Sequence, residues 1–173
     1  FPPGQFRLPA PFAFPSEKAP GTVRIFVVGE SAAQGDPEPA YGFSRHLEAM
    51  LRDRFPGTRF EVVNTAVTAV NSHVLLPVVR DLARRQGDLF LLYVGNNEVV
   101  GPYGAGTVLT SGGASLPLVR ASVWLESTRI GQLLRRALRP RSRHGTGPEW
   151  RGMEMFLEQR VPADAPGMAR VYE

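Results

Sequence analysis

The sequence predicts an α/β fold built on a parallel sheet. Three short apolar runs, at residues 23–28, 59–64 and 88–94, have the length and the β-branched and aromatic content of strands. Two segments with apolar residues at helical spacing, 42–55 and 72–86, lie between them. This β-α-β-α-β order with short connections is typical of a parallel sheet with helices on its faces.

The three predicted strands also indicate where a functional site would lie. The first run (VRIFVV) is almost continuously apolar and ends at Gly29, which is the pattern of a strand buried on both faces. The second is RFEVVN, and the third, DLFLLYV, is the most hydrophobic. Sites in such sheets form at the carboxyl ends of the strands. The candidate loops are therefore residues 29–31, 64–71 and 95–98.

The helices have recognisable ends. Pro56-Gly57 terminates the first helix, and Asn71-Ser72 resembles the N-cap of the second. Pro77 must then fall within the first two turns, because proline deeper in a helix breaks it. After residue 98 the pattern weakens to a Gly-rich loop, a helical stretch, a basic segment and two helical pieces, at residues 101–115, 118–138, 139–150, 149–159 and 165–173.

The chain divides into an arm and a domain. Residues 1–21 are rich in proline, which prevents helices and central strands, so they predict an extended arm. Interleaved phenylalanines indicate that the arm lies against a surface. Residues 22–173 are predicted to form one α/β domain, truncated at its C-terminus because no fourth strand pattern follows the third.

Composition limits the possible functions. The chain has no cysteine, which excludes disulfides, thiolate metal sites and a cysteine nucleophile. No His/Asp/Glu set has metal-ligand spacing, and neither a P-loop nor a dinucleotide fingerprint is present, so we predict no cofactor and no metal. No apolar run reaches the length of a membrane-spanning helix.

The positive charge is carried almost entirely by arginine. The net charge is +4, and Lys18 is the single lysine, a balance typical of GC-rich bacterial genomes. An arginine cluster could contact anionic lipid or nucleic acid, but no nucleic-acid motif accompanies it. We interpret the cluster as solvated surface and predict no nucleic-acid partner; its members are Arg135, Arg136, Arg139, Arg141 and Arg143.

The strand-end loops carry groups suited to acyl transfer. This chemistry needs a nucleophile, a base, and donors placed where the oxyanion develops. Ser31 follows the first strand, where it can begin a helix. A backbone N–H near Ala69 follows the second strand, and the side-chain amide of Asn97 follows the third.

These three blocks resemble the SGNH/GDSL hydrolases. RIFVVGES is similar to their first block, VVNTAVTAVNS to the second and LLYVGNNE to the third, over about residues 22–100. The resemblance implies a flavodoxin-like three-layer sandwich with a parallel sheet. It implies that Ser31 is the nucleophile, and that the N–H groups of Ser31 and Ala69 and the side chain of Asn97 form the oxyanion hole. The implied activity is that of an ester hydrolase or acyl transferase acting on a small-molecule, lipid or carbohydrate ester.

Three positions depart from the family pattern. Glu30 and Glu98 stand where aspartate is usual, and each adds one methylene. Ala69 stands where glycine is usual. Alanine keeps the backbone N–H, but the position must then have φ and ψ values that a non-glycine residue accepts.

The family's fourth block, Asp-x-x-His, is absent. None of His46, His73 and His144 has an aspartate three residues before it. We interpret His46 as a partly buried helix residue and His144 as solvated, and His73 stays open as a substitute base. We expect further strands and the missing block downstream of Glu173, so that the sandwich is incomplete in this chain.

Two functions therefore stay open, a Ser31 acyl-enzyme and a non-catalytic SGNH-like module that binds a ligand or partner. Proteins of this kind are often exported or membrane-anchored, so the resemblance implies membrane proximity through an upstream anchor. The sequence makes no prediction of oligomeric state.

Overall fold

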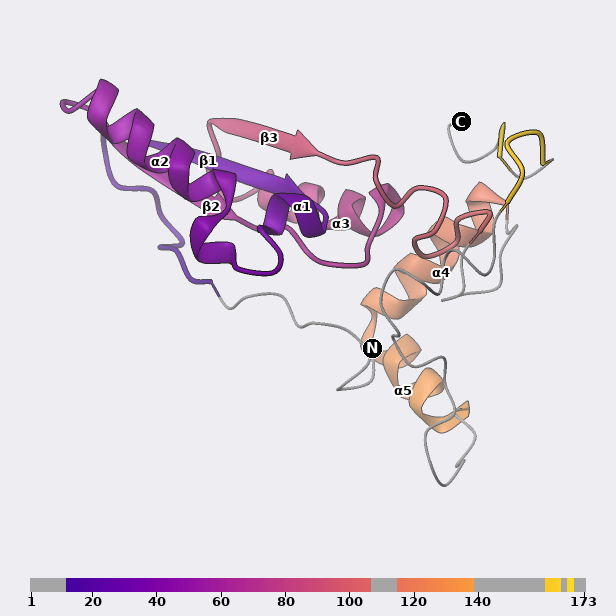
Figure 1. The fold of residues 1–173 in the computed structure, drawn as a ribbon. Coiled ribbons are helices and arrows are strands. Elements are labelled where there is room, and N and C mark those ends of the chain that lie inside the picture. The colour runs from indigo at the N-terminus through magenta and orange to yellow at the C-terminus, as the bar shows by residue number, and fades with distance from the viewer. Residues whose placement is uncertain (1–11, 107–114, 139–160, 166–167, 170–173) are drawn as a thin grey trace. The chain divides into compact units, whose positions relative to one another are not determined.

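The computed structural model describes residues 12–106, 115–138, 161–165 and 168–169 (Figure 1). The chain divides into two compact units, Phe1–Asn97 and Glu98–Glu173, and each is described by itself. The predicted helical piece at 149–159 and most of that at 165–173 lie outside the described residues. The single domain over 22–173 stays a prediction.

The first unit contains the predicted parallel sheet. β1 (Thr22–Gly29) lies between β2 (Arg59–Asn64) and β3 (Leu89–Tyr93) and is parallel to both. The order β2-β1-β3 is that of the first three strands of a flavodoxin-like sheet. The predicted α/β fold class is therefore confirmed, and each strand begins and ends within one residue of its predicted bounds.

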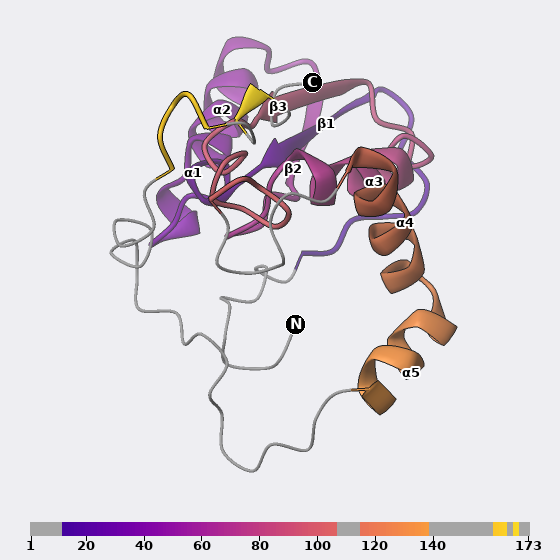
Figure 2. The ribbon, with the colours of Figure 1, turned by 90° about the vertical axis from the view of Figure 1, so that its right-hand side faces the viewer.

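Helices cover both faces of the sheet, which makes three layers (Figures 1 and 2). α1 (Ser31–Gln34) and α2 (Phe43–Arg54) lie on one face, and α3 (Ser72–Leu82) lies on the other. Successive strand side chains point to opposite faces, so β1 contributes to both cores. One core contains Ile25, Val27, Ala33, Val62 and Ala66, and the other contains Phe26, Val28, Val63, Val70, Leu75 and Leu82.

The helix ends follow from local chemistry. α2 stops one residue before Phe55, ahead of the predicted Pro56-Gly57 terminator. Pro77 is the sixth residue of α3 and therefore lies in its second turn, as expected. α3 ends at Leu82, earlier than the predicted end at Gln86, because tighter turns follow and Gln86 has a left-handed φ of 55°.

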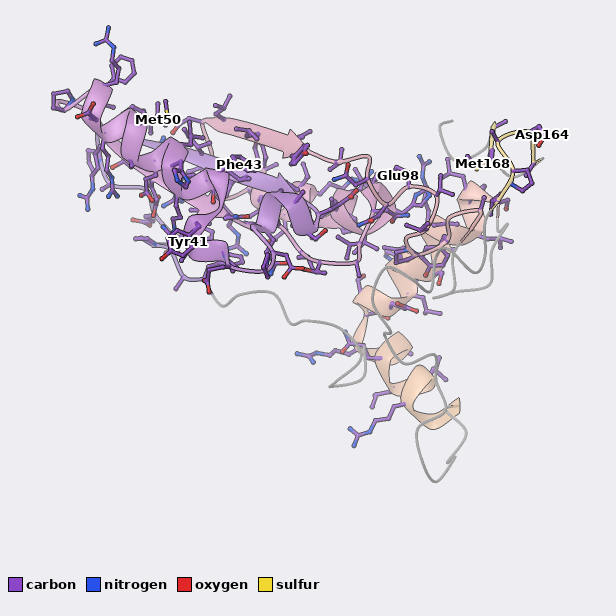
Figure 3. All side chains as sticks on the ribbon, viewed as in Figure 1. Tyr41, Phe43, Met50, Glu98, Asp164 and Met168 are labelled. Atoms are coloured by element: carbon purple, nitrogen blue, oxygen red, sulfur yellow. The ribbon has the colours of Figure 1, made fainter. Side chains whose placement is uncertain are left out.

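β3 carries exposed apolar side chains. Leu89, Leu92 and Tyr93 are 52%, 58% and 46% exposed. Phe43 of α2 packs edge-on against Tyr93 with ring centroids 6.1 Å apart, while Met50 farther along α2 is exposed (Figure 3). In the part of the chain that the structure describes, no strand pairs with the outer edge of β3.

A buried arginine fastens the arm to the sheet. Arg24 of β1 is fully buried, and each of its guanidinium nitrogens donates one hydrogen bond. The acceptors are Glu61 Oε2 at 2.6 Å, the Arg85 carbonyl at 2.7 Å and the Pro15 carbonyl at 2.9 Å. The ring of Phe14 lies 4.9 Å from the guanidinium carbon. A buried charge needs this full set of partners, so the arm completes the environment of Arg24.

A second contact holds the arm near the start of β3. Lys18 Nζ donates to both carboxylate oxygens of Asp88, and Asp88 Oδ2 also accepts the backbone N–H of Arg24 at 2.7 Å. The hydrogen bond from Lys18, followed by that from Arg24, holds the pKa of the Asp88 carboxyl below its usual value. An exposed ion pair adds little stability, so its main effect is to fix the path of residues 12–21.

The second unit contains α4 (Leu116–Ser127) and α5 (Arg129–Leu138). The sequence predicted one helical stretch over 118–138, and the structure divides it at Thr128. Thr128 has extended backbone angles, and its Oγ1 accepts the N–H of Gly131 at 3.0 Å. This is the hydrogen bond of a threonine N-cap, so Thr128 separates α4 from α5 and starts the second of them.

Candidate active site

Ser31 lies directly beyond the carboxyl end of β1. It is the first residue of α1, with Glu30 as the N-cap, as its predicted place at a helix start requires. The N–H groups of a first helical turn have no partner within the helix, which leaves the Ser31 N–H available as a donor. Ser31 is half-buried, and no residue in the described part of the chain hydrogen-bonds to its Oγ.

Gly29 allows the ends of the three strands to come together. A Cβ at this position would overlap the carbonyl oxygen of Tyr93 and the side chain of Ala33. The Gly29 carbonyl accepts the N–H of Val67 at 3.0 Å, which joins the end of β1 to the loop after β2. Glycine is needed here because only a residue without a side chain permits this approach.

Glu30 joins the end of β1 to the loop after β3. The residue is fully buried, and its Oε1 accepts the N–H of Gly95 at 3.2 Å. Gly95 has a φ of 119°, which a residue with a side chain rarely adopts. The added methylene of Glu30, relative to the aspartate of the family pattern, therefore still leaves the carboxylate within reach of this turn.

The side chain of Asn97 joins the loops after β2 and β3. Its Nδ2 donates to the carbonyl of Val70 at 3.0 Å. Val70 follows Ala69 directly, so the amide of Asn97 lies beside the backbone segment predicted to supply the second oxyanion donor. The Nδ2 group has two hydrogens, and the bond to Val70 leaves one of them for a ligand.

Ala69 has a φ of 61°, in the left-handed region that favours glycine. Because alanine stands where glycine is usual, the sequence predicted backbone angles at this residue that a non-glycine residue accepts. The observed φ lies in the small left-handed region, which costs an L-residue about 1–2 kcal/mol. The conformation is held from both sides, since Thr68 Oγ1 donates to Gln34 Oε1 and Asn97 bonds to Val70.

Ala69→Gly is expected to raise the free energy of unfolding by about 0.5–1 kcal/mol, because relief of the left-handed strain exceeds the entropy cost of glycine. The matched control is Ala49→Gly in the exposed middle of α2, which should lower the same quantity by about 1 kcal/mol. Urea denaturation of both variants measures the difference. A loss of stability in Ala69→Gly equal to that of the control would contradict the backbone assignment.

Asn64 secures α1, and so Ser31, to the end of β2. Its Nδ2 donates to the carbonyl of Ala33 at 2.9 Å and to Ser44 Oγ at 3.0 Å. Its Oδ1 accepts the N–H of Ala66 at 3.1 Å. The sequence showed Asn64 only as the end of a strand and the start of the second block. The role of Asn64 in holding α1 was missed because its partners are backbone groups and Ser44, which is distant in sequence, so residue types give no signal.

None of the histidines in the described part of the chain hydrogen-bonds to Ser31 Oγ. His46 is exposed, with Nδ1 3.2 Å from the Gly42 carbonyl, so it is less buried than expected. His73 is the second residue of α3, where the sequence placed it, and it makes no hydrogen bond to Ser31 Oγ. His144 lies outside the described residues.

A separate cavity of about 590 Å³ lies along β2. Its lining includes Phe12 and Phe14 of the arm and the side of β2 near Asn64, but none of Ser31, Ala69 and Asn97. The candidate site residues Ser31, Ala69 and Asn97 therefore lie outside this cavity. Separately, no group of three or more potential metal ligands occurs among the residues that the structure describes.

Comparison with known proteins identifies no relative of this chain. No protein-family model, curated protein or solved structure matches this chain. The assignment to the SGNH/GDSL hydrolases thus stays a prediction that depends on the three sequence blocks.

Proposed function

We propose that this chain carries the nucleophile and oxyanion hole of an SGNH/GDSL-type ester hydrolase or acyl transferase. The observation that supports the proposal is the hydrogen bond between Asn97 Nδ2 and the carbonyl of Val70. It places the amide of the third block beside the Ala69 backbone of the second. Gly29 and Glu30 connect both of these loops to the segment that contains Ser31.

The chemistry follows from these positions. Ser31 Oγ attacks the carbonyl carbon of an ester, and the carbonyl oxygen becomes an oxyanion. The N–H groups of Ser31 and Ala69 and the free N–H of Asn97 donate to that oxyanion. The alcohol leaves, and water or a second alcohol then releases the acyl group from Ser31. The proton that Ser31 Oγ loses ends on the departing alkoxide, which leaves as the alcohol.

Labelling with a fluorophosphonate probe tests the nucleophile. We expect a covalent adduct at Ser31 that peptide mass spectrometry locates and that Ser31→Ala abolishes. Ser72→Ala is the matched control, because Ser72 is the first residue of α3 as Ser31 is of α1. An adduct that persists in Ser31→Ala, or that Ser72→Ala removes equally, would reject Ser31 as the nucleophile.

Asn97→Ala is expected to slow this labelling by about 100-fold, the usual effect of removing one oxyanion donor. Asn96→Ala changes the exposed neighbour and should label at the parent rate. The ratio of labelling rates, measured at equal folded fraction by circular dichroism, checks the prediction. Equal rates in the two variants would show that Asn97 serves the fold alone.

A non-catalytic binding module is the second candidate. The observation that favours it is the Ser31 hydroxyl, which lacks a hydrogen-bonded base among the described residues. This candidate predicts no fluorophosphonate adduct in the parent protein. Rapid, Ser31-dependent hydrolysis of p-nitrophenyl acetate by the 173-residue chain would instead favour catalysis, with His73 as the base to test next.

A further inference from the structure

α5 gathers its large apolar side chains on one stripe. At 3.6 residues per turn, Ile130, Leu133 and Leu134 share this stripe, and Arg129 and Arg136 flank its Leu133 edge. α4 lacks such a stripe, because its apolar residues occur all around the helix. α5 is therefore the amphipathic helix of the second unit.

The apolar stripe of α5 is exposed in the part of the chain that the structure describes. Ile130, Leu133 and Leu134 are 69%, 65% and 49% exposed. A helix in a globular protein normally buries such a stripe, and an exposed one marks an interaction surface. The stripe is therefore suited to binding a partner with an apolar layer.

The charge of the same segment indicates what kind of partner this is. Residues 127–148 contain no aspartate or glutamate, while arginine occurs at positions 129, 135, 136, 139, 141 and 143. Arg129 and Arg136 are exposed, and neither makes an ion pair with any residue that the structure describes. The partner should thus offer anionic groups beside its apolar layer.

We propose that α5 binds the surface of an anionic lipid bilayer. Its apolar stripe would enter the boundary of the acyl chains, and its arginines would remain among the headgroup phosphates. A ten-residue helix is about 15 Å long, half of the hydrocarbon thickness, so it lies on the membrane. Correspondingly, none of the described helices is long and apolar enough to span a bilayer.

Lipid explains both the apolar stripe and the arginines that flank it, whereas a nucleic acid explains only the arginines. Phosphates of DNA or RNA would pair with the arginines but would leave Ile130, Leu133 and Leu134 in water. A bilayer surface accepts the cations and the aliphatic side chains together. This inference does not depend on the function proposed for Ser31.

Vesicle flotation of the complete chain tests the proposal. We expect the protein to float with phosphatidylcholine vesicles that contain phosphatidylglycerol, and to stay at the bottom with phosphatidylcholine alone. Leu133→Gln should lower the partition coefficient roughly tenfold, as expected for the loss of one buried aliphatic side chain. Arg129→Gln combined with Arg136→Gln should also lower it, and added salt should lower that of the parent.

The matched control is Leu118→Gln. Leu118 of α4 is also a leucine with 65% exposure, but it does not belong to the α5 stripe. We expect its partition coefficient to equal that of the parent, with circular dichroism confirming that each variant keeps its helices. Equal flotation with neutral vesicles, no flotation with anionic ones, or equal losses in both leucine variants would overturn the proposal. So would binding to a DNA duplex that needs the arginines but not Leu133.

Discussion

Gly29→Ala is expected to lower the free energy of unfolding by about 3 kcal/mol, at the upper end of the usual cost of overpacking. The new Cβ would overlap the backbone carbonyl of Tyr93 and the side chain of Ala33. Neither can move alone, because Tyr93 belongs to β3, and Ala33 belongs to α1 and the core. The ends of β1 and β3 must therefore separate, and fluorophosphonate labelling of Ser31 should be lost as well.

The matched control for this change is Gly57→Ala. Nothing lies within 4 Å of a Cβ at Gly57, so the same added methyl meets open space. We expect this variant to match the parent or to gain about 0.5 kcal/mol from its less flexible unfolded chain. Urea denaturation of both alanine variants provides the comparison. If Gly29→Ala unfolds at the same urea concentration as Gly57→Ala, the close contact of Gly29 with Tyr93 and Ala33 is contradicted.

Arg24→Met is expected to lower the free energy of unfolding by about 3–5 kcal/mol, the usual cost of breaking a buried charge network. Methionine keeps an aliphatic stem, but Glu61 and the carbonyls of Pro15 and Arg85 all lose their donor. Phe14 also loses the cation above its ring. The arm should then detach, so limited proteolysis between residues 12 and 21 should become faster.

Arg52→Met is the matched control, because it removes the same charge from an exposed ion pair and not from a buried network. Arg52 is also paired with a glutamate at 2.6 Å, but its side chain is 63% exposed. An exposed helical pair of this type contributes about 0.3–0.5 kcal/mol, so this variant should unfold close to the parent. Similar denaturation midpoints for the two methionine variants would show that Arg24 does not fasten the arm.

The sheet could be predicted because each strand carries its own signal. The apolar run from Val23 to Val28 specified a strand buried on both faces, and helical periodicity specified what lies between strands. The arginine inside that run had no assigned role, although it determines where the arm lies. Arg24 was missed because its partners, Pro15, Glu61 and Arg85, are distant in sequence and two of them contribute only carbonyls.

The candidate site was predictable as a set of loops, but its internal geometry was not. The sequence placed Ser31, Ala69 and Asn97 at three strand ends, and the structure joins those ends through hydrogen bonds. The positive φ of Ala69 could not be predicted, because alanine gives no sign of a left-handed backbone. The break at Thr128 was also missed, since apolar residues recur on both sides of it, in α4 and in α5.

The central position of β1 has a consequence for protein synthesis. Of the three described strands, β1 is translated first, β2 second and β3 last, although β1 lies in the middle of the sheet. At about 5–20 residues per second, the ribosome needs a few seconds to pass from Asn64 to Tyr93. During that interval a nascent β1–β2 pair would present the edge of β1 that β3 later covers, together with the side chains of Phe26 and Val28, to other nascent chains. The middle strand is therefore the segment that a chaperone has most reason to hold.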